Sequence, residues 1–266
     1  MKKIALLLLP ALAFIQASAQ KLPKIQEVSL RAPTNAKADG KATEWVKMQA
    51  YNPTVELYYT IANDDKKLYL VLQSKNEGML AKLVNGGITF LVQTSGKKTD
   101  DGAVGAKFPY MEKGQTVGFG WNDDEEGNEK SLFAKAMSKR MAEKIKWIYT
   151  KGLLIKDGPI AIYNNEGILA GAALDSKGVY TCEMTFDLNI LGLSTTSPAK
   201  FAYHITVNGP PNKYGSPLNL EKGGAVSKDG SPVTEAMVEM AKQMIQKQHT
   251  EAIGTTDFWG EYTLAK

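Results

Sequence analysis

Apolar and polar residues alternate along much of the chain, in short runs that end at glycine, asparagine or aspartate. A period of two is typical of strands that bury one face. Two pairs of runs flank tight turns, at Asn63-Asp64-Asp65 and at residues 175–178, and this arrangement predicts hairpins. The expected strands are residues 28–31, 54–62, 68–73, 87–94, 167–174, 178–187, 200–207 and 257–264. Such spacing predicts a mainly β chain folded as an antiparallel β-sandwich.

Three segments instead place apolar residues three or four positions apart, which predicts helices inserted into the sandwich. Residues 79–85 form a short one, and residues 131–149 form a longer one in which Trp147 is expected to be packed. The third spans residues 232–248, with Ser231 as its cap and methionines along its apolar stripe. That stripe either packs on the core, which we favour, or faces a partner or an apolar ligand.

The first 19 residues have the features of a secretory signal peptide. Lys2 and Lys3 precede an apolar stretch over residues 4–15, and residues 17–19 are a small-residue cleavage site. The alternative, a membrane anchor, would need about 20 apolar residues, and no later segment is apolar enough to span a bilayer. We therefore expect export to the periplasm or beyond, leaving residues 20–266 as one domain. Gln20 in place of cysteine indicates that the protein is not a lipoprotein.

Charge and cysteine content narrow the choice of partners. The chain has 32 Lys and Arg against 28 Asp and Glu, with the two signs interspersed, which argues against nucleic acid. Cys182 is the single cysteine, so the chain has no intrachain disulfide. It alternates with polar neighbours and has no histidine nearby in sequence, so we expect a buried apolar residue rather than a reactive thiol.

Motifs for catalysis are missing from the sequence. There is no nucleophile elbow, phosphate-binding loop or dinucleotide fingerprint, and the two histidines, His204 and His249, lie far apart. The adjacent acids at residues 64–65, 100–101 and 123–126 are typical of solvated turns, because glycoside hydrolysis needs two carboxylates across a cleft. Alternation places His204 on the outer face of its strand. We do not expect an enzyme.

A resemblance covers most of the chain after the signal peptide. Its pieces are Asp39-Gly40 with Glu44-Trp45, the hairpin at Asn63-Asp64-Asp65, residues 87–90, residues 180–193 and the C-terminal aromatic strand. In that order they resemble the family-9-like carbohydrate-binding modules, which are relatives of the DOMON β-sandwiches. The resemblance implies a β-sandwich and a glycan clamped between tryptophans from loops. The helices at 131–149 and 232–248 and the lack of a clear tryptophan pair depart from that pattern.

The resemblance also directs attention to particular side chains. Trp259 is the best candidate for one ligand plate and Trp121 a poorer candidate for the other, while Trp45 is expected to plug one end of the sandwich. Some family members bind calcium, and the oxygen-rich residues 122–129 are where it would bind here. No other cofactor is expected. Some DOMON relatives bind haem, for which His204 would be the ligand, with Met111 or Met79 as its partner.

Three functions are consistent with these observations. The first is a secreted, non-catalytic carbohydrate-binding module whose partner is a glycan. The alternatives are a periplasmic scaffold protein that has lost sugar binding and contacts a protein partner through its helical insertions, or a haem-binding DOMON-like domain.

Overall fold

The computed structural model describes residues 21–119, 129–196, 199–210 and 254–266. Several predictions therefore lie outside the described residues: the signal peptide at 1–19, Trp121, nearly all of the calcium candidate at 122–129, and the helix at 232–248. Among the described residues, none of the helices has the length and apolar character needed to cross a membrane.

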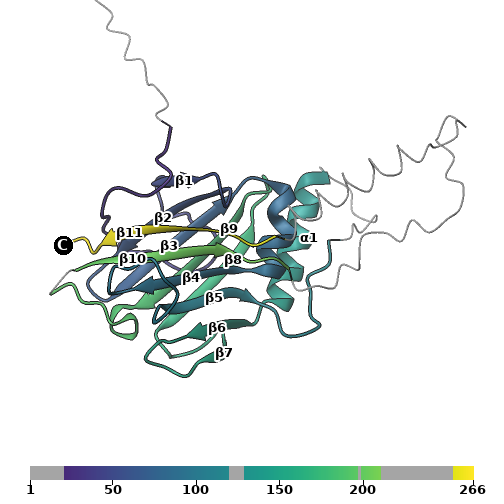
Figure 1. The fold of residues 1–266 in the computed structure, drawn as a ribbon. Helices are drawn as coiled ribbons and strands as arrows, with labels where there is room; N and C mark the ends of the chain where they lie inside the picture. Colours follow the sequence, from purple (N-terminus) through teal and green to yellow (C-terminus); the bar gives the residue numbers. More distant parts are fainter. Residues whose placement is uncertain (1–20, 120–128, 197–198, 211–253) are drawn as a thin grey trace, which may run out of the picture.

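Two antiparallel sheets pack face to face, which confirms the predicted β-sandwich (Figure 1). The five-stranded sheet has the order β1 (Ala50–Asn52), β2 (Leu57–Asn63), β3 (Lys67–Ser74), β9 (Tyr180–Asp187) and β8 (Ile168–Leu174). The six-stranded sheet has the order β11 (Thr256–Thr263), β10 (Lys200–Val207), β4 (Ile88–Gln93), β5 (Val104–Tyr110), β6 (Trp147–Lys151) and β7 (Gly158–Ala161). Both predicted hairpins, β2–β3 and β8–β9, are present.

The main core lies between the sheets and is built by alternation. On β3, Leu68, Leu70 and Leu72 point inward and are fully buried. On β10 the inward residues are Phe201, Tyr203, Ile205 and Val207. The intervening residues of these strands therefore point to the outer face of each sheet, where they contact either a covering segment or solvent.

The outer face of the five-stranded sheet is covered by the segment that precedes β1. Trp45 is buried there with Ala42 against Tyr69 and Val71 of β3, in a cluster separate from the main core. The indole lies 6.2 Å from the Tyr69 ring. The expectation that Trp45 is structural agrees with this packing, but the residue covers a sheet face instead of plugging an end of the sandwich.

The helical elements differ from the prediction at 131–149. The helix α1 (Glu129–Lys144) ends earlier, and Trp147 begins strand β6, where it pairs with Tyr110 and Ala161. The residues that follow Lys144 are aromatic and β-branched, and pairing with β5 and β7 on either side satisfies their backbone groups as a strand. Trp147 is therefore a half-buried strand residue rather than a packed helix residue.

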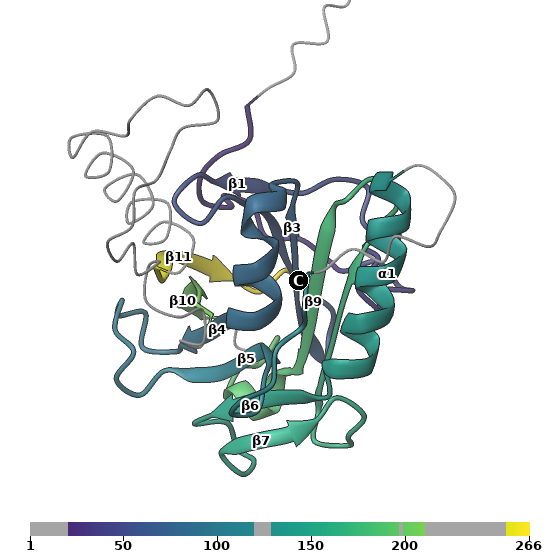
Figure 2. The same ribbon diagram turned by 90° about the vertical axis from the view of Figure 1, so that its right-hand side faces the viewer.

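Helix α1 is held to the sandwich by buried side chains and by hydrogen bonds. Met137 and Met141 are fully buried in the main core cluster. The hydroxyl of Ser138 donates to the carbonyl of Leu174 and accepts from its amide, which ties α1 to edge strand β8. Figure 2 shows α1 on the side of the molecule where β9 and its sheet lie. The remaining helical turns are short: η1 (Glu77–Met79), η2 (Lys82–Gly86) and η3 (Leu188–Leu191). The predicted helix at 79–85 corresponds to η1 and η2.

Two further differences concern strands. The predicted strand at 28–31 is not formed, and only a single bridge joins Arg31 to Asn63. Strand β5 occupies part of a stretch without an alternating pattern, since Gly105 and Pro109 interrupt it. Its partners β4 and β6 hold it in the sheet.

Candidate functional site

Strand β11 forms an edge of the six-stranded sheet and carries the site's central residue. Its inward side chains, Phe258 and Tyr262, are buried in the core, whereas Asp257, Trp259 and Glu261 alternate onto the outer face. Trp259 is partly exposed there and does not belong to the core. This placement meets the first requirement for a ligand plate, which is an accessible ring.

Strand pairing places the side chain of one β10 residue close to the Trp259 ring. His204 is the register partner of Trp259. The hydroxyl of Ser29 donates to the carbonyl of Thr263 at 2.6 Å, so this carbonyl points away from β10. Alternation then makes Trp259 and His204 a pair without mutual backbone hydrogen bonds, the kind in which facing side chains approach most closely.

The two rings are stacked. The imidazole of His204 and the indole of Trp259 have centroids 4.3 Å apart and an interplanar angle of 11°. One face of the indole is therefore covered by imidazole. Because β11 is an edge strand, no strand of the described sheet covers the other face.

His204 is held by a carboxylate at each ring nitrogen. Nδ1 lies 2.8 Å from Oδ1 of Asp100, and Nε2 lies 2.9 Å from Oδ2 of Asp257. The residue is only 9% exposed. The prediction that His204 lies on the outer face is confirmed, but its side chain is shielded rather than solvated.

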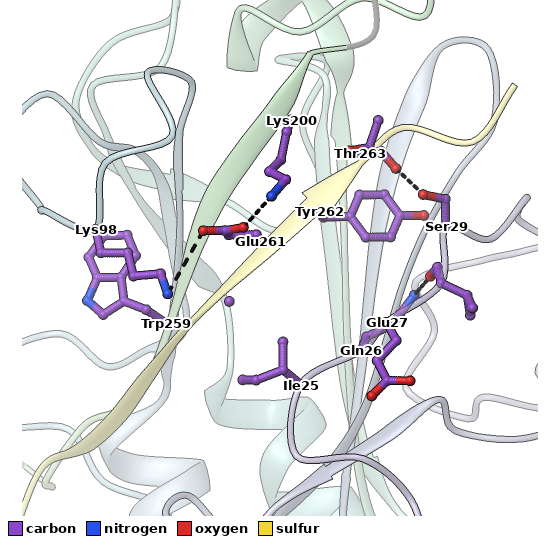
Figure 3. Close-up of a pocket in the computed structure, with 12 residues that line it drawn as sticks. Ile25, Gln26, Glu27, Ser29, Lys98, Lys200, Trp259, Glu261, Tyr262 and Thr263 are labelled. Carbon is purple, nitrogen blue, oxygen red and sulfur yellow. Dashed lines mark hydrogen bonds and ion pairs between the residues drawn. The ribbon is translucent and has the colours of Figure 1, made fainter.

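A groove of about 390 Å³ runs beside Trp259, between β11 and the segment 25–29 (Figure 3). Its polar lining comes from three parts of the chain: Gln26, Glu27 and Ser29; Lys98 from the β4–β5 loop; and Lys200, Glu261 and Thr263 from the sheet. The groove thus combines one aromatic ring with hydrogen-bond donors and acceptors from several directions.

Glu261 stands between the two lysines of the groove. Its carboxylate lies 2.6 Å from Nζ of Lys200 and 4.0 Å from Nζ of Lys98. The hydrogen bond and charge of Lys200 lower the pKa of Glu261. The carboxylate therefore remains ionised and acts as an acceptor beside Trp259.

A second hollow, of about 540 Å³, lies where the β2–β3 turn meets the segment after β9. It is lined by Asp65, Lys66, Lys67, Asp187, Leu188, Asn189, Leu193, Ser194, Thr195 and Thr196. None of these residues has an aromatic ring, so this hollow offers no stacking surface. The groove at Trp259 is the better candidate for a ligand site.

The geometry does not favour the haem arrangement considered from the sequence. Met79 and Met111 belong to the core between the sheets, whereas His204 lies on the outer face. His204 therefore lies on the other side of the sheet from both methionines, and each of its ring nitrogens faces a carboxylate.

The structure also bears on a metal site, on the single cysteine and on the second predicted ligand plate. Within the described residues, no group of three or more histidine, cysteine or acidic side chains is arranged to hold a metal ion. Cys182 is fully buried on β9, and this burial raises the pKa of its thiol, so the prediction of an unreactive residue agrees with the structure. Trp121 lies outside the described residues, so Trp259 alone of the two predicted plates is placed.

The sequence analysis missed most of the polar residues of the groove and of the contacts to His204. Alternation along β11 was a usable signal for Asp257 and Glu261, because it puts them on the same face as Trp259. Lys98 and Asp100 come from a loop whose path no local pattern indicates. Comparison of the chain with protein-family models and with curated protein sequences finds no match.

Proposed function

We propose that this protein is a non-catalytic carbohydrate-binding module that holds a glycan in the groove beside Trp259. The observation that carries the proposal is the partly exposed indole on the outer sheet face, at the wall of a groove lined with polar side chains. Sugars present C–H faces that stack on aromatic rings and hydroxyls that need donors and acceptors. Lys98, Lys200 and Glu261 supply those groups next to the ring.

The chemistry of the groove suits binding rather than hydrolysis. Glu27 and Glu261 both line it, and a glycosidase would use one such carboxyl as a general acid with a raised pKa. The pKa of Glu261 is instead lowered by Lys200, so this group does not hold a proton for a leaving group. The signal peptide predicted at residues 1–19 supports binding after export.

The test is a glycan array followed by calorimetry on the glycans that bind. Replacing Trp259 by alanine removes the stacking surface. We expect affinity to fall by about fivefold or more, because a stacked ring contributes about 1 kcal/mol beyond its buried area and 1.4 kcal/mol corresponds to tenfold. Trp147→Ala is the matched control, since Trp147 is also partly exposed on the six-stranded sheet but does not line the groove.

Two results would contradict the proposal. Equal losses in the Trp259 and Trp147 variants would show that the effect is not specific to the groove. Failure of the wild-type protein to bind any glycan of a broad panel would favour the scaffold alternative, in which a protein partner is contacted.

A further inference from the structure

We propose that His204 is a positioning residue of the groove, which in its doubly protonated form holds the ring of Trp259 and fastens the loop that carries Lys98. This inference rests on the proposed function only where glycan affinity is measured. The protonation state and the loop attachment can be measured without any ligand.

The hydrogen-bond geometry requires an additional proton. A neutral imidazole has one N–H and one lone pair, and a carboxylate only accepts hydrogen bonds. Both nitrogens of His204 lie within 2.9 Å of a carboxylate oxygen. Only an imidazolium donates to Asp100 and Asp257 together; a neutral ring would leave a lone pair facing one of the two carboxylates.

Hydrogen-bond acceptors and an aromatic ring surround His204. Asp100 and Asp257 are the acidic groups in contact with it, and the Thr206 hydroxyl lies 3.5 Å from Nε2. The register neighbour on β4 is the apolar Leu91. The Trp259 indole covers one face, and a cation stacked on an indole is attracted to the ring. The nearby Lys98 and Lys200 are paired with Glu261 instead.

Loss of the proton would loosen the groove at a defined place. Asp257 is fixed by the β10–β11 register, whereas Asp100 belongs to the loop between β4 and β5. The contact with Asp100 is therefore the one to break. Lys98 lies two residues before Asp100 and lines the groove, so the same event releases a ligand-facing cation and removes the charge stacked on Trp259. Glycan affinity should fall as pH rises.

Nitrogen-15 NMR of the imidazole rings tests the protonation state. The chain has two histidines, so a His249→Gln variant leaves a single ring to follow. Histidine changes charge between about pH 5 and 8, and spectra should extend beyond both limits. We expect a form in which both nitrogens of His204 are protonated, because both lie against carboxylate oxygens. A singly protonated ring over the whole range would overturn the proposal.

Asp100→Asn separates positioning from general structure. Asparagine can donate its amide to an unprotonated Nδ1, so a neutral ring can keep both contacts. We expect this variant to bind glycan with an affinity that no longer falls with rising pH, whereas Asp100→Ala should bind weakly at every pH. Asp101→Asn is the control, because its exposed neighbouring side chain does not touch His204, and it should keep the wild-type pH profile.

The two proposals fail in different ways. Glycan binding that is independent of pH, with a singly protonated His204, would remove the positioning role and leave the function intact. A doubly protonated ring in a protein that binds no glycan would leave the positioning of Trp259 intact and remove the function.

Discussion

The carboxylate of Glu183 shows how a single side chain organises the segment that precedes β1. It is 1% exposed, on the outer side of β9. One oxygen accepts from the amides of Asp39 and Gly40 at 3.1 and 2.8 Å, and the other accepts from Nε1 of Trp45 at 3.1 Å. The turn and tryptophan that carry the family resemblance are thus held to the sheet by one buried acceptor.

Replacing Glu183 by glutamine should destabilise the protein. The carboxamide keeps one acceptor but turns an NH₂ group toward N–H donors, leaving buried donors unpaired. A lost partner of this kind costs about 1–3 kcal/mol, measurable by urea denaturation. Glu166→Gln is the control, since Glu166 is exposed, and it should change the free energy of unfolding by less than about 0.5 kcal/mol.

The same residue makes a pH prediction. Burial raises the pKa of Glu183 above 4.5, outweighing the hydrogen bonds from Gly40, Trp45 and Asp39. The folded state therefore holds this proton more tightly than the unfolded chain, and the contribution of Glu183 to stability falls as pH rises above 4.5. The unfolding free energy of the wild type minus that of Glu183→Gln should decline over this interval. A difference that grows with pH would contradict the assignment.

Among the elements, the segment 25–31 takes the place of a strand. Strand β1 pairs with β2 only as far as Tyr59, so Ile61 lies beyond its reach. The side chain of Gln26 accepts from the amide of Ile61 and donates to its carbonyl, both at 2.8 Å. A neighbouring strand would make the same two hydrogen bonds with the backbone of Ile61. The Gln26 side chain therefore satisfies the edge of β2 at this residue.

Gln26→Ala should therefore open that edge. Removing the carboxamide leaves the amide and carbonyl of Ile61 without these partners, at an expected cost of about 1–3 kcal/mol. Hydrogen exchange at the Ile61 amide should accelerate more than exchange in the centre of β3. Glu27→Ala is the matched control, because Glu27 is exposed. Similar exchange in both variants would show that Gln26 does not protect the edge.

Which elements could be predicted depended on whether their signal was local. The β2–β3 hairpin was found because its turn is self-contained: Asp64 accepts from the amides of Lys66 and Lys67. Strand β5 was missed because Gly105 and Pro109 disrupt its pattern, and its pairing with β4 and β6 decides its conformation. The predicted helix extended beyond the end of α1 for the same reason, because β6 is formed by pairing with its neighbours in the sheet.

For the whole molecule, the sequence indicated the sandwich and one residue of the candidate site. Trp259 was identified from residue type and context, and His204 was placed on the correct face by alternation. Their meeting with Asp100 was beyond local reasoning, because Asp100 and His204 are 104 residues apart. Such contacts depend on the path of a loop over a folded sheet, which no periodic pattern specifies.

The two sheets are also joined by a polar contact inside the core. The hydroxyls of Tyr59 on β2 and Tyr203 on β10 lie 2.9 Å apart, and that of Tyr59 also accepts from the amide of Gln26. Burial raises the pKa of both phenols, which therefore remain protonated. One hydrogen-bonded group thus connects both sheets and the amino-terminal segment.

A double-mutant cycle with Tyr59→Phe and Tyr203→Phe should measure this connection. Each single variant already removes the hydroxyl–hydroxyl hydrogen bond, and the double variant cannot remove it a second time, so the effects should not add. We expect a coupling energy of about 0.5–3 kcal/mol from denaturant unfolding. The control cycle pairs Tyr59→Phe with Tyr149→Phe, whose side chain is 40% exposed on β6, and should be additive within about 0.5 kcal/mol. Additive effects in the first cycle would mean that apolar packing alone joins the sheets.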